Sequence, residues 1–148
     1  MSEIRFNHSM PAQIRFSDVD QLGHVNNSVY FSLYDLAKTT YIRTVLGYID
    51  LSKLAIVVAN INANFLAPVF FTDNLEIRTA VVHLGHKSFT LLQQAVTTDT
   101  NEVKCECRTV MVGYNVQEMA PAEIPMHYKE AICAFEGRTL EELSKGVE

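Results

Sequence analysis

Residues 15–30 of the chain read RFSDVDQLGHVNNSVY, and a long helical pattern of apolar residues begins within this stretch. The stretch gathers two carboxylates, Asp18 and Asp20, with His24 and the adjacent pair Asn26 and Asn27. The N-terminus of a helix offers unpaired backbone N–H groups and a partial positive charge to whatever lies beside it. A loop so rich in polar groups at such a place indicates a functional site.

A long helix is expected directly after this loop, over residues 28–46. Apolar side chains recur there at steps of three and four residues, which is the spacing of one helix face. Asn26 or Asn27 suits the N-cap position, and Gly47 stands where a helix-ending glycine is expected. Before the loop, polar and apolar residues alternate over residues 11–16, which predicts a first strand.

Four further strands are expected after the helix, over residues 55–65, 75–84, 88–98 and 103–114. The short connections between the last three suit antiparallel hairpins. A second helix is expected over about residues 126–135, and Thr139 with Glu142 fits a capping box that opens a final short helix. One long helix packed on an antiparallel sheet predicts a two-layer α+β fold, with a single domain over residues 1–148.

Composition narrows the classes of partner. The chain has 148 residues and a formal net charge of −5, so no global basic surface for nucleic acid is expected. No apolar run has the length of a membrane span, and the N-terminus lacks the apolar core of a signal peptide. Three cysteines argue against a disulfide framework and for a reducing compartment, so a cytoplasmic location is expected. Cys105 and Cys107 are interpreted as small buried side chains of one strand face.

Several positions expected to point outward on the later strands are apolar: Val82, Leu92, Val96, Val110 and Val112. One helix covers only one face of a sheet well. The excess of apolar residues on the other face predicts a second buried surface, most simply an interface between copies of the chain.

The two carboxylates of the loop allow different interpretations. A turn-forming role is slightly favoured for Asp18, whereas Asp20 lies closer to the helix N-terminus, which would keep it ionised and suits a nucleophile or a general base. His24 is a candidate base, ligand or orienting group, but no second ligand stands at metal-binding spacing, so no metal is expected. The backbone N–H of Asn27 is a candidate donor to a substrate carbonyl.

Other polar residues carry a plain and a functional interpretation. Asn60, Asn62 and Asn64 share one strand face, which favours a solvated or interfacial surface, although Asn60 or Asn62 could orient water or substrate in a cleft. Lys87 and Ser88 follow a hairpin glycine, so a solvated turn is the default and a phosphate contact the alternative. The sequence holds no glycine-rich phosphate loop and no Gly-x-Ser-x-Gly elbow. The cysteines stand apart from the polar loop, which disfavours a cysteine nucleophile.

Residues 18–30, DVDQLGHVNNSVY, resemble the signature of the hotdog-fold acyl-CoA thioesterases of the hydroxybenzoyl-CoA thioesterase type. Two later segments agree with this resemblance. Ala67-Pro68-Val69 followed by Asp73 is similar to that family's strand break and aspartate turn, and residues 85–89, GHKSF, are similar to its next hairpin. The resemblance extends over about residues 12–114.

The resemblance implies a hotdog fold, in which an antiparallel β-sheet wraps around one long central α-helix. It also implies hydrolysis of an acyl-CoA thioester to free acid and coenzyme A, without a cofactor. Asp20 would be the catalytic carboxylate and Asn27 the carbonyl-polarising amide, with substrate contacts expected at His24, Asn26, Tyr30, Asn62, Lys87 and Ser88. The protein would be a homodimer or homotetramer with its sites at the subunit interface.

Two other functions fit the same fold, which alone does not separate them. One is an acyl-thioester hydratase or dehydratase. Relatives of that kind place aspartate and histidine five residues apart with an asparagine between them, whereas Asp20 and His24 are four apart here. The other is a non-catalytic acyl-CoA-binding protein, which would keep the fold and its interface without needing Asp20.

Overall fold

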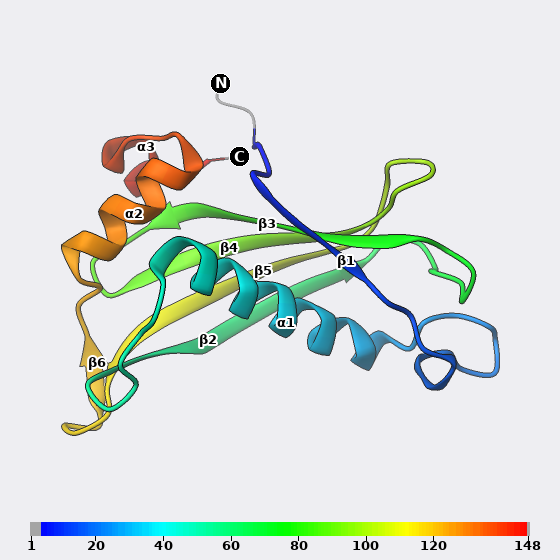
Figure 1. Cartoon of the computed structure of the whole chain (residues 1–148), viewed down its shortest axis with the longest axis horizontal. Coiled ribbons are helices and arrows are strands. Elements are labelled where there is room, and N and C mark those ends of the chain that lie inside the picture. The colour runs from blue at the N-terminus through cyan, green and yellow to red at the C-terminus, as the bar shows by residue number, and fades with distance from the viewer. Residues whose placement is uncertain (1–3, 148) are drawn as a thin grey trace.

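The computed structural model describes residues 4–147. A long helix, α1 (Asn27–Leu46), lies against one face of an antiparallel six-stranded sheet (Figure 1). The spatial order of the strands is β1-β3-β4-β5-β2, with β6 paired to β5. Two short helices, α2 (Met126–Glu136) and α3 (Leu140–Lys145), follow the sheet. The strands are β1 (His8–Ala12), β2 (Leu54–Phe65), β3 (Leu75–Leu84), β4 (Ser88–Thr97), β5 (Glu102–Asn115) and β6 (Ala120–Ala122). The predicted α+β hotdog fold is confirmed.

Helix α1 has the bounds that its apolar spacing predicts, within one residue. Tyr30, Tyr34, Ala37 and Tyr41 follow one another at steps of three and four and are buried against the sheet. Gln93 in the middle of β4 donates a hydrogen bond to the backbone oxygen of Tyr34 over 3.1 Å, which fixes the helix over the sheet. Asn26 is the N-cap, and the helix ends at Gly47 with a φ of 73°.

The four strands predicted after α1 are confirmed within one residue, but the first strand is not where the alternation placed it. It covers His8–Ala12 instead of residues 11–16, because its antiparallel partner β3 begins at Leu75, opposite Ala12, and offers no residue to pair with those after Ala12. Beyond that point the chain turns into a short 3₁₀ helix (Phe16–Asp18), and Phe16 is exposed. The short strand β6, which contains Pro121, was not predicted.

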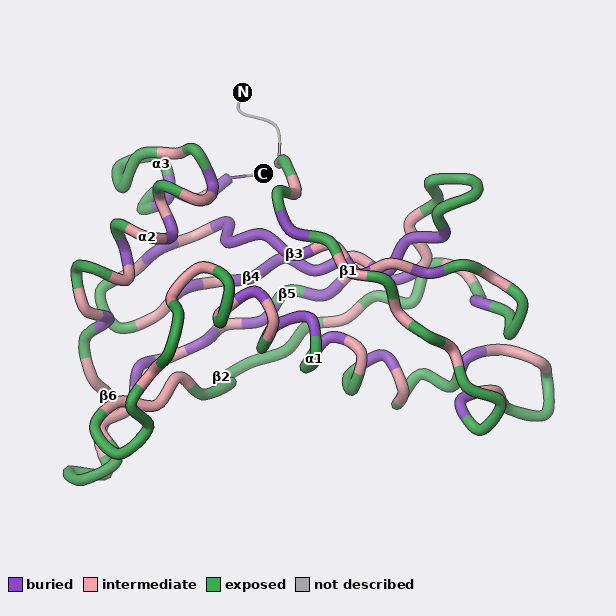
Figure 2. The backbone as a smooth tube through the Cα atoms, in the orientation of Figure 1, coloured by how far each residue is buried: buried purple, intermediate pink, exposed green. Residues whose placement is uncertain are grey.

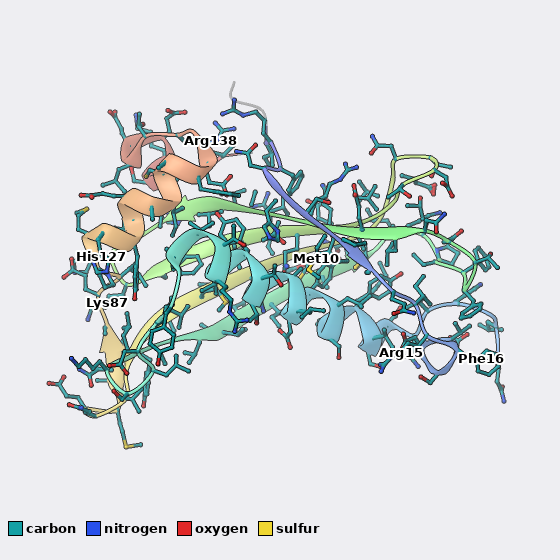
Figure 3. The ribbon with its side chains drawn as sticks, in the orientation of Figure 1. Met10, Arg15, Phe16, Lys87, His127 and Arg138 are labelled. Carbon is teal, nitrogen blue, oxygen red and sulfur yellow. The ribbon has the colours of Figure 1, made fainter. Side chains whose placement is uncertain are left out.

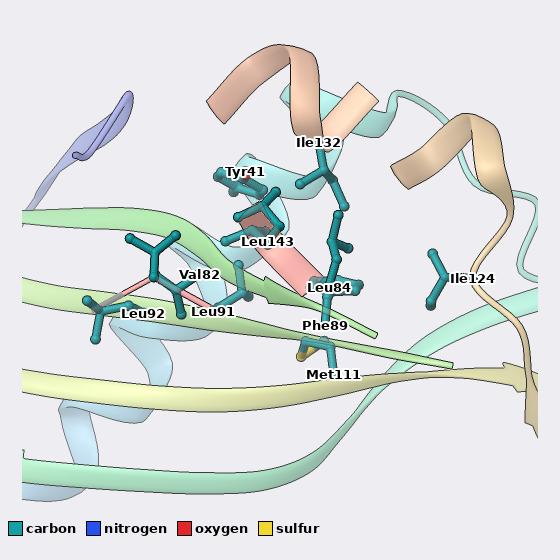
Figure 4. Packing of buried hydrophobic residues seen from close by; sticks show 12 residues of the cluster. Tyr41, Val82, Leu84, Phe89, Leu91, Leu92, Met111, Ile124, Ile132 and Leu143 are labelled. Carbon is teal, nitrogen blue, oxygen red and sulfur yellow. The ribbon is translucent and has the colours of Figure 1, made fainter. Parts of the chain in front are cut away.

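Two buried clusters fill the space between the sheet and the helices. One lies under the N-terminal half of α1 and includes Tyr34, Ile77 and the buried Cys105 and Cys107, as predicted for these cysteines. The other joins Tyr41 to Leu91, Ile132 and Leu143 and holds α2 and α3 against the sheet (Figure 4). None of the helices in residues 4–147 combines the length and the apolar character that crossing a bilayer requires.

The apolar surface of the chain is not where the sequence placed it. Val82, Leu92 and Val96, expected to point outward, are buried within the chain, and Val110 and Val112 are half-buried. Val82 belongs to the same cluster as Leu143 of α3, and its backbone oxygen accepts a hydrogen bond from Val147. Four of the exposed apolar residues lie along β2 (Figure 2), which has a neighbour on one side only: Val57, Val58, Ile61 and Phe65.

Candidate active site

The polar loop folds back on itself as a miniature hairpin before α1 begins. Val19 and Val25 form an antiparallel bridge. Inside it, the backbone N–H of Asp20 donates to the oxygen of His24 over 2.9 Å, and that of Gly23 donates to the oxygen of Asp20 over 3.0 Å. Gly23 has a φ of 80°, a left-handed conformation that glycine adopts without the steric cost of a side chain. This tight turn brings Asp20 and His24 side by side.

The hairpin is docked on the segment between β2 and β3. The backbone N–H of Val25 donates to the oxygen of Val69 over 2.8 Å, and His24 forms a further bridge with Phe70. The rings of His24 and Phe70 meet edge to face with their centres 5.1 Å apart. Val69 itself is fully buried. The loop is thus held by a second segment that is more than forty positions away in the chain.

Asp20 has one carboxylate oxygen engaged and one open. Its Oδ1 accepts hydrogen bonds from the backbone N–H groups of Leu22, over 2.9 Å, and of His24, over 3.3 Å. Within residues 4–147 its Oδ2 has no hydrogen-bonding or ion-pair partner, and the residue is exposed. The side chain is therefore oriented by the loop while one oxygen stays available to a ligand.

Asp18 has the opposite environment and is only 4% exposed. Its carboxylate accepts the backbone N–H of Arg15 over 2.8 Å and pairs with the Arg15 guanidinium over 3.2 Å. The backbone hydrogen bond, assisted by the guanidinium, lowers the pKa of the Asp18 carboxyl below its ordinary value. Asp18 therefore ties the start of the loop together, as its turn-forming interpretation predicted.

The N-terminus of α1 opens beside Asp20. The side-chain oxygen of Asn26 accepts a hydrogen bond from the backbone N–H of Ser28 over 3.0 Å. The backbone oxygen of Asn26 accepts a hydrogen bond from the backbone N–H of Val29 over 2.9 Å. No acceptor for the backbone N–H of Asn27 is found among the described residues. This N–H group lies in the first turn of a 20-residue helix and has no protein partner within residues 4–147. It is therefore suited to bind an oxygen with partial negative charge.

These groups surround a pocket of about 470 Å³. Its polar side is made by Asp20, His24, Asn26 and Asn27, and its apolar side by Tyr30 with the end of β2 and the residues that follow. Burial raises the pKa of Tyr30 to about 12, so this phenol is neutral near pH 7. The full lining comprises Asp20, His24, Val25, Asn26, Asn27, Tyr30, Phe65, Leu66, Ala67 and Pro68.

Three residues predicted to contact substrate lie elsewhere in the chain. Lys87 and Ser88 stand at the β3–β4 hairpin, and Figure 3 shows Lys87 at the opposite end of the molecule from Arg15 and Phe16 of the loop. Asn62 is paired with Arg108 in the middle of the β2–β5 ladder. Alternation along the strand turns Asn62 to the face opposite that of Phe65. The chain by itself does not bring these three to the pocket.

The sequence did not predict that the apolar wall of the pocket is a binding surface. Phe65 ends β2 and Leu66 follows it, and only Ala67 and Pro68 were singled out, as part of a strand break. Among the described residues no three His, Cys, Asp or Glu side chains gather as a metal site. Burial raises the pKa of Cys105 and Cys107, which keeps both as thiols in the core.

Several known proteins are similar to this chain in sequence and in fold. The acyl-CoA thioester hydrolase YbgC of Escherichia coli O6:H1 is 25% identical over 118 residues, covering 78% of this chain and 87% of the relative. A thioesterase of Thermus thermophilus, whose structure contains coenzyme A and zinc, superimposes with a TM-score of 0.79 at 29% identity, covering 91% and 98% of the two chains. The PA5185 protein of Pseudomonas aeruginosa also gives a TM-score of 0.79, at 26% identity and with 88% and 92% covered.

The sequence profile of the thioesterase-like superfamily matches residues 14–132, a range that holds the polar loop, α1 and the whole pocket lining. The match runs well beyond half of the chain, and the resemblance seen in the loop pointed to the same family. The chain belongs to the thioesterase-like superfamily.

Proposed function

We propose that this protein hydrolyses acyl-CoA thioesters to a free acid and coenzyme A, with Asp20 as the attacking or water-activating carboxylate. The observation that carries the proposal is the meeting of two groups in one pocket. These are the open oxygen of Asp20 and the backbone N–H of Asn27 at the helix start. The name of YbgC and the coenzyme A in the Thermus thermophilus structure support this substrate class.

A thioester is already an activated acyl group, so the protein needs to supply only an attacking or water-activating carboxylate and a donor to the carbonyl oxygen. In the nucleophilic route, an Asp20 oxygen attacks the thioester carbon, the C–S bond breaks, and coenzyme A leaves as a thiolate that takes a proton from water. Water then hydrolyses the mixed anhydride to the free acid and regenerates the carboxylate. In the alternative route, Asp20 removes a proton from a water molecule that attacks the same carbon. Both routes need the one oxygen that the loop leaves open.

Either route places negative charge on the thioester oxygen. A donor aimed at that oxygen lowers the barrier, and the aligned peptide dipoles of α1 add a positive partial charge at the same place. The Asn27 amide and the axis of a 20-residue helix supply both. His24 and Asn26 line the pocket next to this donor, where they are suited to contact the thioester or the pantetheine arm.

The residues far from the pocket fit the proposal if two chains pair along β2. Antiparallel pairing of the two β2 edges would reverse one chain relative to the other and bring the second subunit's hairpin, with Lys87 and Ser88, to the end that holds the pocket. From β2 of one subunit to β4 of the second there are three strand spacings of about 4.8 Å, so the pocket and this hairpin would be about 15 Å apart. The long pantetheine and nucleotide part of coenzyme A can span this distance. Lys87 would then contact a phosphate.

The test is thiol release from a panel of acyl-CoA esters by the purified protein and by Asp20→Asn. We expect the variant to lose about 100-fold or more in kcat/KM, since positioned acid–base or nucleophilic groups contribute at least this much. Its circular dichroism and thermal unfolding should match the wild type, because the amide oxygen of the substituted side chain can still accept the two backbone N–H groups that the carboxylate accepts.

Asp99→Asn is the matched control, since Asp99 is an exposed turn carboxylate at the β4–β5 connection. It should leave thiol release unchanged. Full activity of Asp20→Asn would overturn the role of Asp20. Hydration of an enoyl-CoA without thiol release would identify a hydratase, and tight acyl-CoA binding without either reaction would identify a binding protein.

A further inference from the structure

Two aromatic side chains in contact with each other line the apolar side of the pocket. Tyr30 is 3% exposed and is the fourth residue of α1, while Phe65 is the last residue of β2. Their ring centres are 5.6 Å apart with the planes tilted by 55°. Phe31 also meets Phe65 edge to face, with the ring centres 6.5 Å apart. Aromatic rings at such distances attract one another and form a rigid wall.

The wall stands close to the reacting carbonyl. A carbonyl held by the Asn27 amide lies one helical turn from Tyr30, a rise of only about 4.5 Å along α1. Behind Tyr30 stands Tyr34, which is 2% exposed, with its ring centre 6.4 Å from that of Tyr30. The path between α1 and the sheet is thus filled by two successive tyrosines. An acyl group that runs inward from the carbonyl meets the wall after a few carbons.

We propose that Phe65, together with Tyr30, limits the length of the acyl group, so that the substrates are short-chain acyl-CoA esters. The inference rests on the proposed function and adds the substrate class to it. Phe65 is the adjustable part of the wall. Tyr30 is 3% exposed and belongs to the buried core, whereas Phe65 is 42% exposed at the end of an edge strand, where its ring can be removed without leaving a closed cavity.

The experiment measures kcat/KM for acetyl-, butyryl-, octanoyl- and palmitoyl-CoA with the wild type, Phe65→Ala and Phe65→Leu. The wild type should favour the two short esters. Phe65→Ala should raise the ratio of the octanoyl to the butyryl value by about tenfold or more, because even one methylene in an apolar pocket changes kcat/KM by about that factor. Phe65→Leu, which keeps an apolar side chain on the strand, should give a smaller shift in the same direction.

Phe71→Ala is the matched control. Phe71 is also aromatic and 47% exposed, but it lies outside the pocket lining, so its removal should leave the chain-length profile unchanged. A wild type that prefers palmitoyl-CoA, or variants at Phe65 that keep the wild-type profile, would overturn the length limit while the hydrolysis itself stands. Absence of thiol release from every ester would overturn the proposed function and the length limit with it.

Discussion

Asp18 and Asp20 are two positions apart, and their surroundings give them different properties. Asp18 is buried and accepts both the backbone and the guanidinium of Arg15, while Asp20 is exposed and keeps one oxygen open. The difference follows from the surroundings of each side chain: Asp18 is buried at the base of the loop, and Asp20 lines the open pocket. A carboxylate that stabilises the loop and a carboxylate suited to chemistry thus occupy one short segment.

Asp18→Asn should lower the free energy of unfolding by about 1–2 kcal/mol at pH 7, the size expected when a charged hydrogen-bond partner is lost. Because the folded state lowers the pKa of Asp18 below its ordinary 3.8, the stabilisation is present above that value and is lost as the pH falls through the lowered pKa. Urea unfolding at several pH values should show the gap between wild type and variant closing in acid. A gap as large at pH 2 as at pH 7 would contradict this assignment.

The residues of the site divide into those that the sequence predicts and those that it does not. Asp20, His24, Asn26, Asn27 and Tyr30 lie within one short segment, so their order along the chain and the start of the helix suffice to bring them together. Phe65 and Leu66 reach the pocket only through the pairing of β2 with β5 and the docking of the loop on Val69. No local pattern marks such long-range neighbours, and the same holds for the place of Lys87 relative to the pocket.

Among the secondary-structure elements, α2 is joined to α1 and to the sheet by one buried carboxylate. Glu136, 3% exposed, accepts hydrogen bonds from the Tyr41 hydroxyl of α1 and from the backbone N–H of Val81, over 3.1 Å for the latter. Val81 lies where the β3–β4 register shifts, so its N–H is directed to a side chain. The positive charges of Arg138 and Arg5 favour the ionised form of this carboxylate. The ring of His8 meets that of Tyr41 edge to face. Burial outweighs these contacts and raises the pKa of Glu136.

Glu136 should therefore make the protein less stable as the pH rises. Its folded-state pKa lies above its ordinary 4.5, so the folded chain binds the extra proton, and the stabilisation is complete below 4.5 and lost as the pH rises through the raised pKa. The slope contributed is at most about 1.4 kcal/mol per pH unit. Chemical unfolding of Glu136→Gln between pH 4 and pH 8 should lack this fall.

The neighbouring Glu130→Gln, on the exposed side of α2, is the control and should keep the wild-type slope. If Glu136→Gln and the wild type showed parallel curves over this range, the buried carboxylate would not titrate above its ordinary pKa. His8 also faces this cluster. Burial lowers the pKa of His8, so its protonation stabilises the unfolded chain and works against Glu136 in acid. His8→Phe, made in the wild type and in Glu136→Gln, separates the effect of His8 titration from that of Glu136.

The elements differ in how far their own residues determine them. α1 and the four long strands follow their periodicity because each buries a face whose spacing matches its geometry. β1 does not, because residues 11–16 alternate as a strand but find no partner beyond Leu75, and the Arg15–Asp18 contacts turn the chain instead. β6 is three residues long and exists only through pairing with the end of β5. Short elements of this kind depend on neighbours that local sequence does not reveal.

At the scale of the whole molecule, one edge strand of the sheet, β2, is unusual for a monomeric protein. β2 is twelve residues long, pairs only with β5 among the described strands, and contains neither proline nor a charged residue. Exposed edge strands normally carry such residues or are kept short, because open N–H and C=O groups recruit another strand. β1, at the other edge, is short and contains Pro11. The pocket opens beside the end of β2, at Phe65 and Leu66.

We therefore expect a homodimer formed by antiparallel pairing of two β2 edges, with each pocket next to the second subunit. Ile61→Lys should give a monomer in light scattering and strongly reduced thiol release, although Asp20 and Asn27 are untouched. Ile61 is 41% exposed on the edge strand, so the monomer keeps the lysine charge in water, and a charged side chain on an edge strand disfavours pairing with a second strand. A stable pairing of this kind buries about 800 Å² on each chain, and circular dichroism should show the fold retained without it.

Leu140→Lys is the matched control for this substitution. Leu140 is 40% exposed, opens α3 and lies on the β3 side of the molecule, away from β2. It should stay dimeric and active, since the same charge is added where no strand pairs. A wild type that is monomeric and fully active would contradict the dimer. If Ile61→Lys were monomeric yet as active as the wild type, the dimer would stand but the pocket would be complete within one chain, and Lys87 of the second subunit would have no part in binding coenzyme A.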